Sequence, residues 1–304
     1  MSHSHPITDT PTTAATTASA LPRGVSRTRP RGLSAEATFI GRSLRHAVRD
    51  VESLLMAVAL PVMLMLMFTF VFGGALDPDG GYVDYVVPGI ILTCAGFGAA
   101  STSLSVASDM TSGFVDRLRT MPVRASAVIT GHVAASLARN LFATSIVLLV
   151  AVAIGFRPSA GVGEWLATVG LVALYILAIT YLFAAIGLAA KSPESANGYG
   201  FILLFLPYVS SAFVPVETMP RWLEVFADNQ PITPIIDALR ALLIGTEMGA
   251  SGYLAVGWCL LILGAAGNAV TSLGGFNALI SLAFGLATVL CIVLLIVDHF
   301  RHRG

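Results

Sequence analysis

Long apolar runs separated by short polar stretches fill the sequence from residue 54 to residue 297. A helix that crosses the hydrocarbon core of a bilayer needs about 20 predominantly apolar residues, with a range of roughly 17–25. The first runs close to that length lie at 54–72, 85–107, 141–156, 165–190 and 199–216. The run at 141–156 is the shortest of these, and we expect its helix to begin further upstream.

Two more apolar stretches, 253–270 and 276–297, are separated by the turn-like residues 272–275. Residues 264–275 are small and weakly apolar, so a partial or broken span at 253–270 stays open. We predict an all-α polytopic membrane protein with about six transmembrane helices, and seven remain an alternative. The number of spans within 251–297 decides on which side of the membrane the C-terminus lies.

The N-terminal part of the chain differs in character from the spans. Residues 1–33 are rich in Thr, Ala, Ser, Pro and Arg, which predicts a disordered tail. No apolar stretch precedes or directly follows its arginines, which argues against a secretory signal, and a transit peptide is a weaker alternative. Residues 33–55 predict an amphipathic helix in the membrane interface, with a plain cytosolic helix as the alternative. Its apolar stripe comprises Phe39, Ile40, Leu44, Val48 and Val51, beside a basic face with Arg42, Arg45 and Arg49.

The composition supports an integral membrane protein. Hydrophobic residues make up 56% of the 304 residues, charged residues only 11%, and the mean hydropathy is +0.82. An ordinary soluble domain has roughly 25% charged residues. Lys and Arg total 17, as do Asp and Glu, so no net basic charge is available to bind nucleic acid.

The distribution of basic residues predicts the orientation. With five alternating spans and a cytosolic N-terminus, the cytosolic segments hold 14 of the 17 Lys and Arg residues. The outer segments hold only Arg157, Arg221 and Arg240. Positive residues concentrate on the cytoplasmic side of membrane proteins, so we predict a multi-pass plasma-membrane protein with a cytosolic N-terminus.

Several kinds of chemistry are missing from the sequence. The apolar cores of the expected spans carry no Asp, Glu, Lys or Arg, which disfavours a proton-coupled carrier or an ion pump. The single lysine, Lys191, follows Ala190, so no P-loop is present to bind ATP. No motif of a hydrolase or metalloenzyme appears, and we expect no cofactor, no metal and no catalytic residue on this chain. If transport is active, its energy has to come from another polypeptide.

One polar segment between spans could contact a partner protein. Within 109–124, charged and apolar residues alternate as in a short amphipathic helix that stops before a proline, a form that suits a groove on another protein. A basic loop that only sets the topology is the alternative, and both interpretations stay open. The candidate contact residues are Asp116, Arg117, Leu118, Arg119, Met121, Pro122 and Arg124.

A second segment, 217–250, is expected outside the cell. It contains two short helical patterns, and Trp222 suits an interfacial helix with its ring at the headgroup level. Pro231, Thr233 and Pro234 separate the two patterns. A simple cap over the outer ends of the spans is the plainer interpretation.

These residues, taken in order, resemble the membrane subunits of ABC-2 type exporters, and most closely the daunorubicin-resistance permease group. The resemblance covers roughly 35–260. Its motifs are Val87-Pro88-Gly89-Ile90, Asp116-Arg117-Leu118-Arg119-x-x-Pro122, Ser192-Pro193-Glu194, Ser211-x-Phe213-Val214-Pro215 to Met219-Pro220, and Pro231-x-Thr233-Pro234-x-x-Asp237-x-x-Arg240. Each motif is weak alone, but the ordered set is specific.

The resemblance implies that 34–304 is an ABC-2 type transmembrane domain and that 109–124 is a coupling helix facing a separate ATP-binding subunit. Arg117, Arg119 and Arg124 would make charged contacts with that subunit. Such families usually end after a sixth span, whereas here a further apolar segment follows 253–263.

The resulting hypothesis is a permease that forms a homodimer or heterodimer, pairs with ABC ATP-binding subunits, and expels hydrophobic or amphipathic drugs or lipid-like molecules. The alternatives are a non-transporting membrane scaffold or assembly protein and an intramembrane lipid-modifying enzyme. The sequence does not distinguish among substrates.

Overall fold

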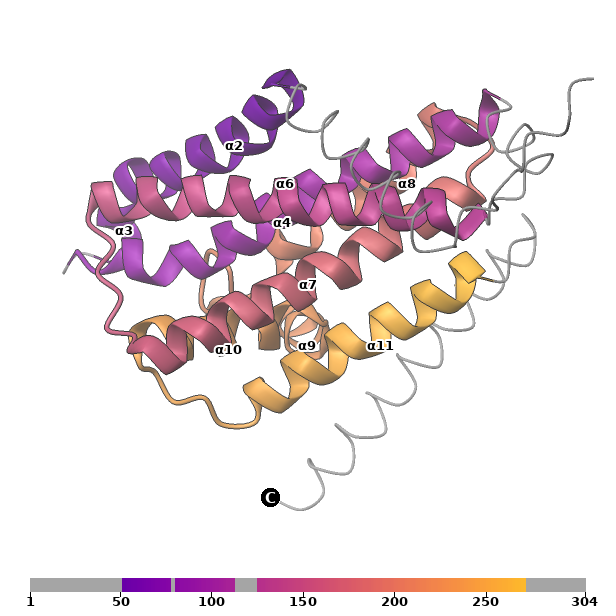
Figure 1. Ribbon diagram of the computed structural model, residues 1–304. Coiled ribbons are helices and arrows are strands. Elements are labelled where there is room, and N and C mark those ends of the chain that lie inside the picture. The colour runs from indigo at the N-terminus through magenta and orange to yellow at the C-terminus, as the bar shows by residue number, and fades with distance from the viewer. Residues whose placement is uncertain (1–50, 78–79, 113–124, 272–304) are drawn as a thin grey trace, which may run out of the picture.

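The computed structural model describes residues 51–77, 80–112 and 125–271, and these form a bundle of helices (Figure 1). The first crossing is nearly continuous, through α2 (Val51–Leu66), a wider π-helical turn (Met67–Phe72) and α3 (Gly73–Leu76). The remaining α-helices are α4 (Tyr82–Thr111), α6 (Ala125–Ile154), α7 (Val162–Ala189), α8 (Pro193–Leu203), α9 (Arg221–Asn229), α10 (Ile232–Ile244) and α11 (Ser251–Thr271).

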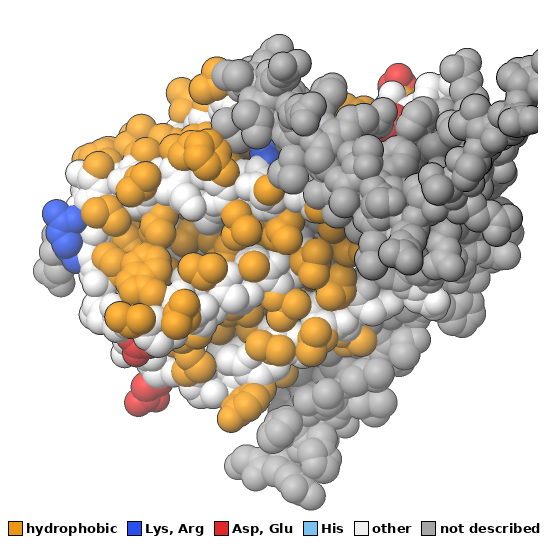
Figure 2. Space-filling view, in the orientation of Figure 1, with side chains coloured by type: hydrophobic (Ala, Val, Ile, Leu, Met, Phe, Trp, Pro, Cys, Tyr) orange, Lys and Arg blue, Asp and Glu red, His pale blue; other side chains and the backbone are white. Residues whose placement is uncertain are grey.

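Five of the described helical segments are long and apolar enough to cross a membrane: Ala57–Leu76, Tyr82–Thr111, His132–Ile154, Val162–Ala189 and Ser251–Val270. Large apolar side chains cover their outward faces, as at Met63 and Leu149, which are 71% and 69% exposed. In Figure 2 apolar side chains spread over the described part of the face, and the charged ones lie mostly toward its edges. Such a surface suits lipid rather than water. The chain is an all-α polytopic membrane protein.

Helix α4 lies at the centre of the bundle and packs against α2, α6, α7 and α8. Small residues permit this close packing, as in other membrane helix bundles. A Cβ atom on Gly98 would lie 1.4 Å from Asn140 Oδ1 of α6, and one on Gly89 would lie 2.6 Å from the Ala212 side chain. Larger residues at these positions would push the neighbouring segments away.

The bundle has two ends, named here after the first and last residues of α4. At the Tyr82 end, the Arg157 N–H donates to Asp84 Oδ1, and the Ser159 N–H donates to the Leu243 carbonyl oxygen at 3.0 Å. The Thr111 end holds the start of α6, the end of α7, the start of α8 and the end of α11.

The predicted span at 199–216 is not a single helix. The segment crosses the bundle antiparallel to α4, because Gly200 packs near Ser103, Gly96 near Leu204, and Gly89 near Ala212. Helix α8 ends at Leu203, a short 3-10 helix follows (Leu206–Val209), and the chain reaches the Tyr82 end at Phe213, whose carbonyl oxygen accepts from the Tyr82 hydroxyl at 2.7 Å. We call residues 193–215 the broken crossing.

The two short helical patterns expected in 217–250 are α9 and α10, but most of α10 is buried in the bundle, so it is not an interfacial helix. Ile232 lies with Ala178 and Ile179 of α7 around one cavity, whereas Leu243 at the other end of α10 bonds to Ser159 before α7 begins. Ala178 lies about 24 Å along α7 from its first residue, at 1.5 Å per residue. Helices α9 and α10 with the intervening Gln230–Pro231 therefore form a re-entrant hairpin, which dips into the bundle and returns to the Tyr82 end.

Three other expectations can be compared with the structure. Residues 253–270 form one continuous helix, α11, rather than a partial span, while 276–297 lies outside the described residues. The described parts of 108–139 are mainly helical, because α4 continues to Thr111 and α6 begins at Ala125. The expected interfacial helix at 33–55 lies outside the described residues apart from its last turn, which belongs to α2.

Candidate functional site

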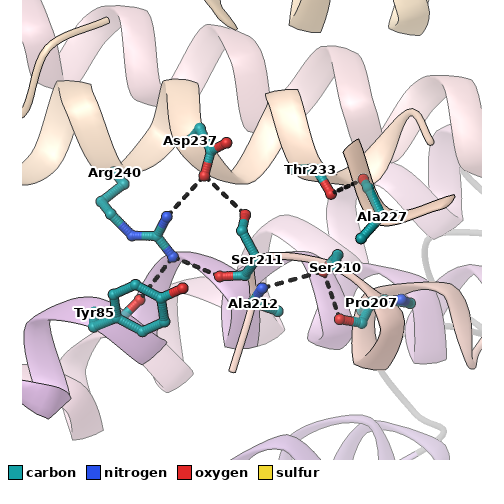
Figure 3. Close-up of polar contacts among 9 residues, drawn as sticks. All are labelled: Tyr85, Pro207, Ser210, Ser211, Ala212, Ala227, Thr233, Asp237 and Arg240. Carbon is teal, nitrogen blue, oxygen red and sulfur yellow. Dashed lines mark hydrogen bonds and ion pairs between the residues drawn. The ribbon is translucent and has the colours of Figure 1, made fainter. Parts of the chain in front are cut away.

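A polar cluster fastens the re-entrant hairpin to the broken crossing and to α4 (Figure 3). From α10, the Arg240 guanidinium donates to Asp237 Oδ1 at 2.7 Å and to the Ser211 carbonyl oxygen at 2.8 Å. It also donates to the Tyr85 carbonyl oxygen of α4 at 3.2 Å and lies 4.0 Å from the centre of the Tyr85 ring. The Ser211 hydroxyl donates to Asp237 Oδ1 at 2.8 Å. One arginine thus connects three chain segments.

The Arg240 guanidinium is a buried charge and therefore needs several partners. The Arg240 side chain is only 12% exposed, and a buried charge is costly unless it is paired and hydrogen-bonded. The carboxylate of Asp237, on the same helix, compensates that cost, and the Tyr85 ring adds a cation–π contact. The cluster holds the base of the hairpin and shows no geometry for catalysis.

Polar contacts also hold the tip of the hairpin. The Gln230 side-chain amide donates to the carbonyl oxygens of Leu206 and Val209 in the broken crossing. The Thr233 hydroxyl donates to the Ala227 carbonyl oxygen at 2.6 Å, which closes the turn between α9 and α10. Pro231 and Pro234 fit this place, because proline is tolerated at the start of a helix.

Helix α9 presents a different surface. Trp222 is 74% exposed, and Phe226 is exposed beside it, so its apolar side chains face outward as an interfacial helix would. Partial burial, followed by the nearby Glu224, Glu217 and Asp237 carboxylates, raises the pKa of Asp228 above its usual value.

A second polar cluster joins α4, α6 and α7 in the half of the bundle nearer the Thr111 end. The Thr102 hydroxyl donates to Ser136 Oγ at 3.0 Å, and Ser136 Oγ lies 3.4 Å from Thr180 Oγ1. Arg139 donates to Ser101 Oγ at 2.5 Å. The expected span at about 141–156 leaves Arg139 out, whereas the span in α6 begins at His132 and includes it. The small and apolar residues at 133–138, directly before Arg139, could have indicated the earlier helix start.

A histidine–carboxylate pair links α4 to α6 near the Thr111 end of the bundle. His132 Nε2 lies 2.8 Å from Asp109 Oδ2, and both side chains are partly exposed. The segment between these helices contains the expected partner contacts Asp116, Arg117, Leu118, Arg119, Met121, Pro122 and Arg124, which lie outside the described residues. The pair thus joins α4 and α6, the two helices that this segment connects.

The other expected site residues, Trp222, Pro231, Thr233, Pro234, Asp237 and Arg240, all belong to the re-entrant hairpin. Asp237 and Arg240 meet in one cluster, Pro231 and Thr233 lie near the hairpin tip, and Trp222 stands apart on α9. Among the described residues, no group of three His, Cys, Asp or Glu side chains is placed to hold a metal ion.

Comparison with known proteins decides the family. Residues 37–244, more than half of the chain, match the model of the ABC-2 type transporter family. The chain belongs to the ABC-2 type transporters. The daunorubicin resistance ABC transporter permease protein DrrB1 of Streptomyces coeruleorubidus is 30% identical over 247 residues, which cover 80% of this chain and 85% of that protein.

More distant ABC-2 relatives also align with this chain. The probable doxorubicin resistance ABC transporter permease protein DrrC of Mycobacterium tuberculosis is 24% identical over 207 residues, covering 67% of this chain and 75% of that protein. ABC transporter G family member 20 of Dictyostelium discoideum is 25% identical over 175 residues, which cover 55% of this chain but only 23% of that longer protein. As a member of the family, this chain is a membrane permease of an ABC transporter.

Proposed function

We propose that this chain is the membrane subunit of an ATP-driven exporter that expels hydrophobic or amphipathic molecules such as anthracycline drugs from the cell. The family match carries the proposal, and the names of two relatives, which are resistance permeases for daunorubicin and doxorubicin, support the substrate class. The N-terminus and the Thr111 end face the cytosol, and the re-entrant hairpin opens toward the outside. A second permease chain, identical or related, completes the transporter.

ATP binding and hydrolysis take place on a separate ABC subunit, because the sequence lacks a P-loop. That subunit docks on residues 109–124, where Arg117 and Arg119 make charged contacts. The position of this segment supports the assignment, because it directly connects α4 with α6 and the Asp109–His132 pair joins those helices beside it. A force applied there acts on the central helix of the bundle.

The test is charge reversal of the docking segment. In cells that produce the chain with its ATP-binding subunit, we expect Arg117→Glu/Arg119→Glu to abolish daunorubicin efflux and to reduce co-purification of that subunit, while membrane insertion stays normal. Arg27→Glu/Arg29→Glu is the matched control, since it makes the same charge change in the N-terminal tail and should transport normally. Normal efflux and normal complex recovery in the first double variant would contradict the docking assignment.

The source of energy is tested separately. Efflux should continue when the proton gradient is collapsed and ATP is maintained, and it should stop when the ATP-binding subunit carries an inactive P-loop. If the purified chain alone transported daunorubicin into liposomes under an imposed proton gradient, the exporter assignment would be replaced by that of a secondary carrier.

A further inference from the structure

Helix α11 lies at the edge of the described bundle and exposes one face along most of its length (Figure 1). Only 33% of the residues in its most apolar stretch are buried, against 72% in α4. Alternating steps of four and three residues connect the outward positions, and such steps are typical of a helix that packs along a second helix. These positions are Tyr253, Gly257, Leu260, Gly264 and Gly267, of which only Gly267 is partly covered.

The glycines on this face are unlike a surface that only meets lipid. A Cβ atom added to Gly257, Gly264 or Gly267 would have no neighbour within 4 Å among the described residues. The exposed faces of α2 and α6 instead carry large apolar side chains, such as Met63 and Leu149. Glycine weakens a helix relative to alanine, but at membrane helix interfaces it lets two backbones approach closely. The face therefore fits a further helix.

The chain itself contains a segment of the right length and position. Residues 276–297 carry no Asp, Glu, Lys or Arg, and 22 apolar and small polar residues are enough to cross a bilayer. Only residues 272–275 separate this run from the end of α11 at Thr271. A connection of two to five residues is typical of two antiparallel helices that pack against each other.

The two sequences also match in register. Steps of four and three recur in the second run at Ser281, Gly285, Thr288, Ile292 and Leu295. If this run were a helix antiparallel to α11, the two stripes would stay aligned to within one residue over their whole length. The opposed pairs would include Gly267–Ser281, Gly264–Gly285 and Gly257–Ile292.

We propose that residues 276–297 cross the membrane antiparallel to α11 and cover its glycine face, so that the C-terminus lies at the Tyr82 end of the bundle. The chain then crosses seven times, counting the broken crossing. Arg301 and Arg303 leave the cytosolic side in this arrangement, but 12 of the 17 Lys and Arg residues remain in the expected cytosolic segments, so the charge bias persists. The proposal holds whichever end of the bundle faces the cytosol.

The packing is tested by disulfide formation in membranes, with Cys94, Cys259 and Cys291 replaced by alanine. After oxidation and denaturation, free thiols are counted by the gel shift that PEG-maleimide produces. Gly264→Cys/Gly285→Cys should lose the shift and remain a monomer on the gel. Gly264→Cys/Ala287→Cys is the matched control and should keep its shift, because two residues turn a helix by about 200° and place position 287 on the other side.

The side of the C-terminus is tested separately, without any change in the packed helices. In the same background, labelling of Gly304→Cys by an impermeant thiol reagent is compared with that of Glu217→Cys and Lys191→Cys. Glu217 is exposed after the broken crossing has reached the Tyr82 end, whereas Lys191 is exposed between α7 and α8 at the Thr111 end. Gly304→Cys should label as Glu217→Cys does, on whichever side that is.

Each other outcome overturns the proposal. Labelling of Gly304→Cys together with Lys191→Cys would show that 276–297 does not cross. Equal crosslinking of the two cysteine pairs, or of neither, would show that it does not pack on the glycine face, and a disulfide-linked dimer would show that a second copy covers this face. Gly257→Cys/Ile292→Cys repeats the measurement if the first pair fails to fold.

Discussion

Replacing Arg240 by methionine tests whether the polar cluster holds the re-entrant hairpin in place. The substitution removes the donor to the Asp237 carboxylate and to the carbonyl oxygens of Ser211 and Tyr85. Breaking a buried ion pair costs about 3–5 kcal/mol, and a lost hydrogen bond about 1 kcal/mol. Asp237 is 36% exposed and keeps its bond from the Ser211 hydroxyl, so water and that bond offset part of the loss. We expect a net destabilisation of about 3 kcal/mol.

The assay is thermal unfolding of the purified chain in one detergent at one scan rate, because membrane proteins often unfold irreversibly. At about 2–4 °C per kcal/mol for a large domain, Arg240→Met should lower the midpoint by about 6–12 °C. Arg221→Met is the matched control, since Arg221 is 78% exposed and lies 3.9 Å from Glu224. Its loss should cost less than about 1 kcal/mol. Equal shifts in the two variants would refute the argument that Arg240 fastens the hairpin.

The packing of α4 against α6 gives a second prediction: Gly98→Ala should sharply lower the yield of folded protein, because its Cβ would overlap the Asn140 side chain, and Asn140→Ala should restore the yield. Gly170→Ala, where nothing lies within 4 Å of an added Cβ, is the control. A third concerns pH: the raised pKa of Asp228 means that its charge destabilises the folded state above that pKa. Asp228→Asn should therefore raise the unfolding midpoint at neutral pH, and the gain should vanish below about pH 4, where Asp228 is protonated in both states. Fourth, in a background without native cysteines, Glu217→Cys, exposed before the start of α9, should react with an impermeant thiol reagent on intact cells, and Lys191→Cys only after permeabilisation. The reverse labelling pattern would overturn the proposed orientation.

The unbroken spans were predictable because a bilayer imposes a simple length and polarity requirement. The runs around α2, α4, α6 and α7 were recognised in place, and the helix of the run at 141–156 begins upstream as expected, at Ala125. The extent of this extension was not predicted, because an arginine such as Arg139 is typical of a loop. In the bundle its guanidinium donates to Ser101 on α4, so a charge can lie within the helix. A contact between two helices cannot be deduced from the hydrophobicity of either one.

The broken crossing could not be predicted from its composition, which is as apolar as that of a continuous span. Pro207 was a local indication, because proline interrupts the hydrogen bonds of a helix. The backbone groups freed by the break are satisfied by a residue far along the chain, since Gln230 donates to the carbonyl oxygens of Leu206 and Val209. For the same reason α10 looked like an interfacial helix. Its burial depends on the groove that the break leaves beside α7.

The polar contacts of α4 suggest how a force at the Thr111 end would travel under the proposed function. Three polar contacts tie α4 to α6 at two levels, Asp109–His132 at one and Thr102–Ser136 with Arg139–Ser101 at the other, and such bonds resist sliding between the two helices. α4 also meets the broken crossing at small residues, where Gly89 and Gly96 allow the close approach of Ala212 and Leu204.

At the Tyr82 end the hydrogen bonds of Tyr82 and Arg240 fasten α4 to the crossing and to the base of the hairpin. A shift of α4 and α6 as one body would therefore move the base of the hairpin, while its tip is held by Gln230 to the carbonyl oxygens beside the break. The resulting strain would act on the part of the re-entrant hairpin between its base and its tip. The cavity lined by Ala178 and Ile232 lies at that tip, so under the proposed function its shape should respond to the state of the ATP-binding subunit.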